Sequence, residues 1–150
     1  MNLLRNLPVA VAMFFAATGM AHADGLKVVA SFSIIGDLAK QVGGEMVSVT
    51  TLVGPDSDAH VYEPRPQDAA AMAEADVVLI NGLGFEGFIE RLAQSSKPKS
   101  APVELSRGVA TLGAAEEDRA DEVPGHDHGD GIDPHAFQSV SNAQVYVRNI

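Results

Sequence analysis

The sequence predicts an α/β protein whose mostly parallel, four-stranded sheet is flanked by helices. Short runs rich in valine, isoleucine and leucine recur along the chain, and segments with the apolar spacing of a helix separate them. The runs are almost continuously apolar, as in strands that are covered on both faces. Strands of this kind that alternate with helices favour a parallel sheet between helical layers.

The first strand and helix are expected directly after residue 25. Residues 26–32 form a continuous apolar run that predicts a buried strand. The apolar side chains between positions 34 and 42 have helical spacing, and Ser33 is a suitable N-cap for that helix. Gly43 and Gly44 are expected to end it, because glycine commonly follows the last turn of a helix.

The second strand and the second helix enclose a polar loop. Residues 47–53 are rich in β-branched side chains and predict a strand, which gives way at Gly54 to a loop that carries His60. Pro66 suits the first turn of a helix, and the alanine-rich residues 67–75 continue it. The loop thus follows a strand end, where α/β proteins commonly place ligand-binding groups.

Two more strands and one more helix complete the expected sheet. Residues 77–80 predict a short, fully buried strand. Asn81-Gly82 then turns the chain into an amphipathic helix that includes residues 85–92. Residues 103–105 are expected to add the fourth strand.

Residues 113–130 differ in composition from the rest of the chain. They are acidic, contain glycine and lack apolar periodicity, which predicts a mobile loop within the domain. His126 and His128 lie among its carboxylates, so the loop could gather a divalent ion transiently, or it could be a solvated acidic loop without a ligand. After it, Ser141 with Gln144 forms a capping-box pattern for a last helix.

The first 23 residues predict a cleavable export signal. Arg5 precedes an apolar run at residues 7–17, and Ala21-His22-Ala23 has the small-x-small form of a signal peptidase site. The run is shorter than the roughly 20 residues that span a bilayer. Cleavage would leave residues 24–150 as one soluble, exported domain, so His22 is expected to have no function in it.

Charge and composition argue against several classes of function. The chain has 20 acidic and 10 basic residues and a formal net charge of −10, which repels phosphate backbones and argues against a nucleic-acid partner. It has no cysteine, which excludes disulfides, thiolate metal ligands and thiol catalysis. A metal ion would therefore be held by imidazole and oxygen ligands.

Two histidines are candidate metal ligands, His60 in Asp58-Ala59-His60 and His135 in Asp133-Pro134-His135. Pro134 fixes the local backbone and provides a rigid base for the His135 side chain. Neutral imidazole binds zinc well, and Asp58 or Asp133 could orient a ring through its second nitrogen. The two histidines lie far apart in the sequence, so spacing alone leaves open whether they share a metal or are ordinary surface or capping residues.

A glycine-rich stretch offers a rival site for a dinucleotide cofactor. Gly82-Leu83-Gly84-Phe85-Glu86-Gly87 matches the G-x-G-x-x-G fingerprint between a strand and a helix, and Glu104 lies where a ribose-binding acid is expected. Glu86 would, however, place a carboxylate at the helix N-terminus, where the pyrophosphate must bind. We therefore expect no cofactor site here, with Glu86 complementing the helix dipole and Phe85 in the core.

Motifs for catalysis give weaker support to an enzyme. Glu63 could act as a general base beside His60, but Pro64 favours an extended backbone there, and a loop carboxylate is more often a structural partner. The motifs G-x-S-x-G and H-E-x-x-H are absent from the sequence. Tyr62 and Phe137 are expected to pack around the histidines. We predict no catalytic residue.

Taken together, these segments resemble the periplasmic substrate-binding proteins of zinc and manganese ABC transporters, also described as the adhesin-like or solute-binding protein family 9. The resemblance extends through nearly all of the chain after residue 23, and the family tends to carry tryptophan where this chain has Phe137. The resembling segments, in order, are residues 28–35, 58–66, 75–86, the histidine-bearing acidic loop and residues 133–137.

The resemblance implies that residues 24–150 are the N-terminal lobe of a two-lobed protein, with His60 and His135 as its two metal ligands. The loop with His126 and His128 is similar to the histidine-rich loop of many zinc-type members and is an accessory to that site. A second lobe, joined by a long helix, would supply a further His or Glu and an Asp. We accordingly expect that the chain stops before this C-terminal lobe and binds metal weakly alone.

The function that the resemblance implies is capture of a divalent metal ion in the periplasm and delivery to an ABC permease in the inner membrane. The ion would be a transported ligand, with Zn²⁺ favoured over Mn²⁺ because of the histidine loop. The sequence has no cysteine for lipid attachment, so a soluble periplasmic form is expected. Two alternatives stay open: a zinc-dependent hydrolase that activates water near Glu63, and a non-functional or adhesion-related fragment.

Overall fold

The computed structural model describes residues 25–111 and 131–150. The predicted export signal and the predicted loop 113–130, with His126 and His128, lie outside these residues. Among the described helices, none is both long and apolar enough to cross a membrane. The elements follow one another as β1 (Leu26–Phe32), α1 (Ser33–Gly43), η1 (Gly44–Met46), β2 (Val47–Val53), α2 (Pro66–Glu74), β3 (Val77–Ile80), α3 (Ile89–Ser96), β4 (Val103–Glu104), η4 (Ala136–Gln138) and α4 (Val140–Asn149).

The four strands form one parallel sheet in the order β2-β1-β3-β4. Val28 of β1 lies opposite Val49 of β2 on one side and Val77 of β3 on the other. This confirms the predicted α/β class with a four-stranded parallel sheet. Because all strands run the same way, their carboxyl ends lie along one edge, and the loops that follow them gather there.

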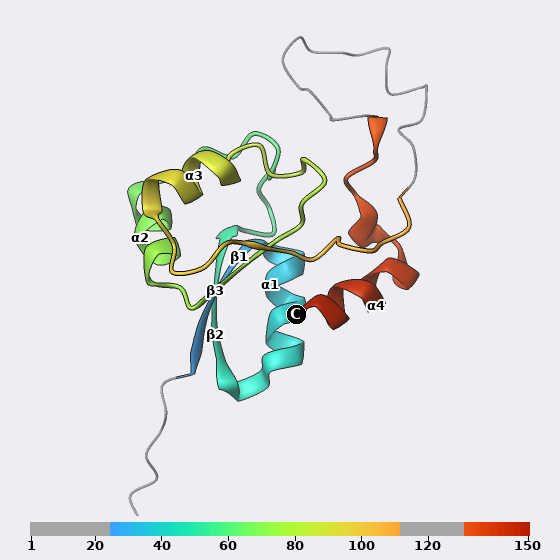
Figure 1. The fold of residues 1–150 in the computed structure, drawn as a ribbon, viewed down its shortest axis with the longest axis horizontal. Helices are drawn as coiled ribbons and strands as arrows, with labels where there is room; N and C mark the ends of the chain where they lie inside the picture. The colour runs from blue at the N-terminus through green and yellow to red at the C-terminus, as the bar shows by residue number, and fades with distance from the viewer. Residues whose placement is uncertain (1–24, 112–130) are drawn as a thin grey trace, which may run out of the picture.

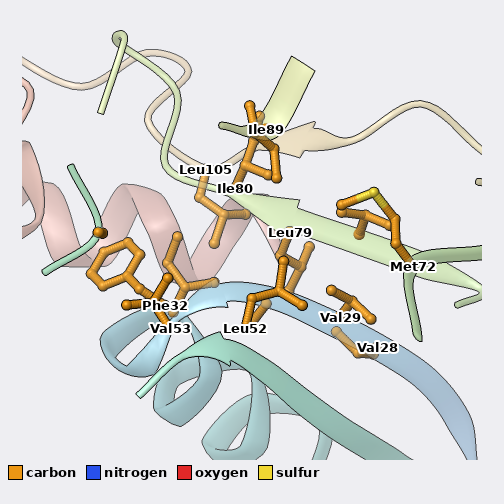
Figure 2. Close-up of a cluster of buried hydrophobic side chains, with 14 of the residues drawn as sticks. Val28, Val29, Phe32, Leu52, Val53, Met72, Leu79, Ile80, Ile89 and Leu105 are labelled. Carbon is orange, nitrogen blue, oxygen red and sulfur yellow. The ribbon is translucent and has the colours of Figure 1, made fainter. Parts of the chain in front are cut away.

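Helices cover both faces of the sheet, as Figure 1 shows. Helices α1 and α4 contact each other on one face, and α2 and α3 contact each other on the opposite face. The side chains of β1 from Val28 onward and of β3 from Val78 onward are buried between these layers, as predicted for strands that are covered on both faces. The edge strands β2 and β4 are more exposed. The close-up in Figure 2 shows part of this core, including Val28, Val29, Phe32, Leu52, Val53, Met72, Leu79, Ile80, Ile89 and Leu105.

Two predicted helix caps are wrong. Ser33 is the first residue of α1, because Phe32 has an extended backbone that runs directly from β1 into the helix and occupies the N-cap position. Helix α4 begins at Val140, with Ser139 at its N-cap, and no capping side-chain hydrogen bond is made. Ser141 therefore lies inside the first turn, where its hydroxyl is 2.8 Å from that of Ser139.

Helix α3 begins later than predicted. It starts at Ile89, whereas the sequence pattern extends it back to Phe85. Glu86 lies in the turn before the helix, where Ser31 and the backbone of Asn81 and Gly82 hold its carboxylate. Phe85 is buried all the same, so its apolar character reflects the core and not a helix face.

Candidate metal centre

His60 and His135 lie together at the carboxyl edge of the sheet. Their Nε2 atoms are 3.2 Å apart, and their ring centroids are 5.3 Å apart. His60 comes from the loop between β2 and α2, and His135 immediately precedes η4. The fold thus brings together the two histidines that the sequence analysis singled out.

Each histidine is the third residue of an Asp-X-His turn of the same kind. The backbone N–H of His60 donates to Oδ1 of Asp58 at 2.8 Å. The backbone N–H of His135 donates to Oδ1 of Asp133 at 2.9 Å. An aspartate that accepts from the amide two residues later forms a compact, locally satisfied turn. The repeated use of this turn fixes the backbone from which each imidazole projects.

Asp133 also orients the imidazole of His135. Its Oδ1 lies 2.8 Å from the ring Nδ1, a hydrogen bond that places the ring proton on Nδ1. The other nitrogen, Nε2, then keeps its lone pair and faces His60. Hydrogen bonds from the backbone and the ring of His135 hold the pKa of Asp133 below its usual value, so the carboxylate stays an acceptor.

Phenylalanine rings pack against the two imidazoles. The ring of Phe85 lies 4.7 Å from that of His60 and 5.5 Å from that of His135, both with edge-on geometry. Phe137 contacts Phe85 at 5.3 Å and His135 at 5.9 Å, which confirms its predicted packing role. Phe32, at the end of β1, lies 4.9 Å from Phe85. We call Phe32, Phe85 and Phe137 the aromatic floor.

Tyr62 fulfils another role than the one expected. Its ring packs on Phe88 at 5.2 Å, and its hydroxyl donates to Asp68 at 2.7 Å. Asp68 also accepts from the backbone N–H of Arg65 and so caps the start of α2. Burial raises the pKa of Tyr62, which keeps the hydroxyl protonated as a donor. Tyr62 thus holds the end of the His60 loop against α2.

Glu86 is turned into the protein, contrary to the expectation that it complements a helix dipole. Its carboxylate accepts from the hydroxyl of Ser31 at 2.5 Å and from the backbone N–H groups of Asn81 at 2.7 Å and Gly82 at 3.2 Å. Burial raises the pKa of Glu86, and these hydrogen bonds oppose the shift. The carboxylate fills the inner side of the glycine-rich turn, and the following helix begins only at Ile89, which argues against a dinucleotide site at this turn.

Around the two imidazoles, residues 25–111 and 131–150 contain no group of three or more histidine, aspartate or glutamate side chains placed to hold a metal ion together. Glu63 lines a hollow of about 370 Å³ beside His60, together with Arg91 and Phe88. Arg65, two residues after Glu63, forms an ion pair with Asp68. In this part of the chain the two imidazole nitrogens therefore remain the candidate ligands of the site.

Asn81 and Glu86 support the site, a role that the sequence does not indicate for either residue. Both are buried, and both anchor the turn after β3 on which Phe85 lies. Asn81-Gly82 reads as a simple turn signal, and Glu86 reads as a surface carboxylate. No local pattern distinguishes them, because their other partners, Ser31, Pro134 and Tyr146, lie far away in the sequence.

The chain resembles known proteins of one kind. Residues 28–150 match the family model described as "Zinc-uptake complex component A periplasmic". The manganese-binding lipoprotein MntA of Halalkalibacterium halodurans is 39% identical over 85% of this chain and 38% of its own length. The iron-binding protein YfeA of Yersinia pestis is 33% identical over 85% of this chain and 38% of its own. The chain spans about two fifths of the length of these relatives.

Solved structures agree with this similarity. The Mn-bound periplasmic metal binding protein of candidatus Liberibacter asiaticus superimposes with a TM-score of 0.66 at 31% identity, over 81% of this chain and 42% of that one. Zn(II)-bound AdcA of Streptococcus pneumoniae shares the fold, with a TM-score of 0.64 at 23% identity over 83% of this chain and 24% of that one. MntA, YfeA and the Liberibacter protein are named as metal-binding proteins and not as enzymes, in agreement with the predicted absence of catalysis.

Proposed function

The chain belongs to the family described as "Zinc-uptake complex component A periplasmic", and on this premise we propose that it captures a divalent transition-metal ion between His60 and His135. The observation that carries the proposal is the 3.2 Å separation of their Nε2 atoms. In this arrangement the ion is cargo, which is bound and released unchanged.

The separation of the two nitrogens suits joint ligation of one ion. Zinc–nitrogen bonds of about 2.0–2.1 Å at a tetrahedral angle put two ligand nitrogens about 3.3 Å apart. The observed 3.2 Å is close to this value. An ion between His60 and His135 would replace the direct contact of the rings by two metal–nitrogen bonds and would require little movement of either turn.

Zinc is the metal we propose first, with manganese as the alternative. A right angle at the ion, as in octahedral coordination, reproduces the 3.2 Å separation with bonds of about 2.3 Å, so the pair accommodates either geometry. The preference for zinc rests on His126 and His128, which add imidazole donors to the acidic loop 113–130 as an accessory that raises the local ion concentration.

Delivery to an ABC permease of the inner membrane is the second part of the proposal. It is supported by the family assignment and by the export signal predicted at residues 1–23, which together favour a periplasmic protein. Two imidazoles leave further coordination positions open, and we propose that a second lobe fills them with a His or Glu and an Asp. In the 150-residue chain water takes these positions, so weak binding is expected.

Calorimetric titration of the chain with Zn²⁺ and Mn²⁺ tests the proposal. We expect weak binding of one ion that is lost in His60→Ala and in His135→Ala. Gln138→Ala is the matched control, because Gln138 lines the same hollow as His135 and carries no imidazole. A fourth variant lacks residues 113–130 and separates the loop from the pair.

The outcomes distinguish the pair from the loop. Retained but slower or slightly weaker binding in the loop variant agrees with an accessory loop. Binding that survives both histidine substitutions and disappears with the loop would overturn the proposal. Tight one-to-one binding by the 150-residue chain would contradict the idea that a second lobe completes the site.

A further inference from the structure

Asn81 connects three parts of the fold beneath the metal centre. It follows β3 directly and is fully buried. Its side-chain Nδ2 donates to the carbonyl of Gly82 at 2.8 Å and to the carbonyl of Pro134 at 3.0 Å. Its Oδ1 accepts a hydrogen bond of 2.5 Å from the hydroxyl of Tyr146, on α4. A single carboxamide thus joins the sheet edge, α4 and the turn that carries His135.

We propose that Asn81, held by Tyr146, is a positioning residue that fixes the Pro134–His135 peptide group and thereby the direction of the His135 imidazole. The inference rests on the proposed function, since it concerns the alignment of one of the two ligands. It goes beyond the two ligands, because Asn81 forms no hydrogen bond to either imidazole among those described and acts on His135 only through the backbone.

The peptide group between Pro134 and His135 is held at both of its polar ends. Its carbonyl oxygen accepts from Asn81, and its N–H donates to Asp133 at 2.9 Å. A planar peptide that is bonded on both sides cannot rotate without breaking one of these hydrogen bonds. Since this rotation would swing the Cα–Cβ bond of His135, the two contacts together set where Nε2 points.

The orientation of the Asn81 carboxamide is itself determined. Gly82 and Pro134 both present carbonyl oxygens, so the nitrogen of the amide must face them, and Oδ1 must face Tyr146. Burial, followed by the charge of Glu86, raises the pKa of Tyr146 to about 12, which keeps its hydroxyl protonated as a donor. Tyr146 therefore holds the amide in the one orientation that reaches Pro134.

Two substitutions test the inference. Tyr146→Phe removes one hydroxyl and keeps the buried ring, and Asn81→Ala removes the whole amide. Tyr146→Phe keeps the test decisive if Asn81→Ala does not fold. Asn149→Ala is the matched control, because Asn149 is also on α4 and its amide donates to the carbonyls of Leu105 at 2.8 Å and Arg107 at 2.9 Å, away from His135.

Two readouts separate positioning from stability and from metal binding itself. The first is the nuclear Overhauser contact between ring protons of His60 and His135 in the metal-free chain. The centroids of the two rings are 5.3 Å apart. The second is the Zn²⁺ affinity by calorimetry. We expect Tyr146→Phe to weaken the ring contact and to lower the affinity about tenfold, as for other indirect partners of metal ligands, and Asn149→Ala to preserve both.

Each outcome has a defined meaning. If Tyr146→Phe keeps the ring contact and the affinity, or if Asn149→Ala lowers both to the same extent, the positioning role of Asn81 is wrong. If the wild-type chain binds no Zn²⁺ but Tyr146→Phe still loses the ring contact, the proposed function fails while the positioning role stands. Loss of the contact in Tyr146→Phe together with a lower affinity supports both.

Discussion

The carboxylate of Asp133 accepts two hydrogen bonds from one residue, His135: one from the backbone N–H at 2.9 Å and one from the ring Nδ1 at 2.8 Å. Asp58, at the corresponding position of the other turn, accepts from the backbone N–H of His60 at 2.8 Å. The two turns are therefore alike in the backbone. The second hydrogen bond of Asp133, with the imidazole of His135, leads to the first prediction.

Asp133→Asn should weaken metal binding. The asparagine amide offers a donor as well as an acceptor, so it holds the Nδ1 proton of His135 less well and leaves Nε2 less basic. We expect about a 10- to 100-fold loss of Zn²⁺ affinity, measured by calorimetry. Gln138→Ala, at a residue that lines the same hollow as His135, serves as the control. An unchanged Zn²⁺ affinity in Asp133→Asn would contradict an effect through the ring.

Phe85→Ala should reduce both the stability and the metal affinity of the chain. Removing the ring leaves a cavity under both imidazoles and is expected to cost about 3–5 kcal/mol in the free energy of unfolding. Phe88→Ala is the matched control, because Phe88 is also buried and has Tyr62 as its aromatic partner. Urea denaturation should show a lower free energy of unfolding in both variants. Zinc titration should show a larger loss of affinity in Phe85→Ala than in Phe88→Ala. If Phe85→Ala and Phe88→Ala bind zinc with the same affinity, the aromatic floor does not support the two histidines.

Glu86→Gln should change how stability depends on pH. Burial raises the pKa of Glu86 above its usual value of 4.5, so its contribution to stability is fully present below 4.5 and is lost as the pH rises through the folded-state pKa. Glutamine does not titrate. In urea denaturation from pH 4 to pH 8, we therefore expect the wild type to lose stability relative to Glu86→Gln. A difference that stays constant over this range would show that Glu86 does not titrate differently in the folded state.

Gly82→Ala should destabilise the fold more than Gly84→Ala. Both glycines have positive φ angles, of 82° and 75°, which cost an alanine about 1 kcal/mol. A Cβ at Gly82 would also lie 3.1 Å from Oγ of Ser106, whereas one at Gly84 would meet open space. We expect a cost of roughly 1–3 kcal/mol for Gly82→Ala, measured as the difference in unfolding free energy. Equal costs would mean that Ser106 moves aside freely.

The strands of this protein could be predicted from the sequence more closely than the starts of its helices. Residues 26–32, 47–53 and 77–80 form the strands at the bounds expected from their apolar runs. The predicted helix begins at Phe85, whereas α3 begins at Ile89. Partners from Ser31 and the turn at Asn81 draw Glu86 inward and hold that turn, so tertiary contacts override the helical periodicity.

The two histidines of the candidate site could be singled out from the sequence, and the residues that support them could not. His60 stands out by its loop after a strand end and His135 by the Asp133-Pro134 that precedes it, and the family resemblance implies their pairing. Asn81 and Tyr146 gave no such signal, since one reads as a turn residue and the other as part of a helix. Their roles depend on a contact across 65 positions of the chain, which only the folded topology creates.

The meeting of His60 and His135 joins positions 75 apart in the chain, so it also has a meaning for folding. In the unfolded chain, closing a segment of that length is opposed by loop entropy, and neither turn can present both nitrogens. An ion bridging them would bind the native state far more tightly than the unfolded one and would raise the thermal midpoint of unfolding as its concentration rises. Metal uptake during refolding would then report completion of the whole sheet, and not the earlier formation of either turn.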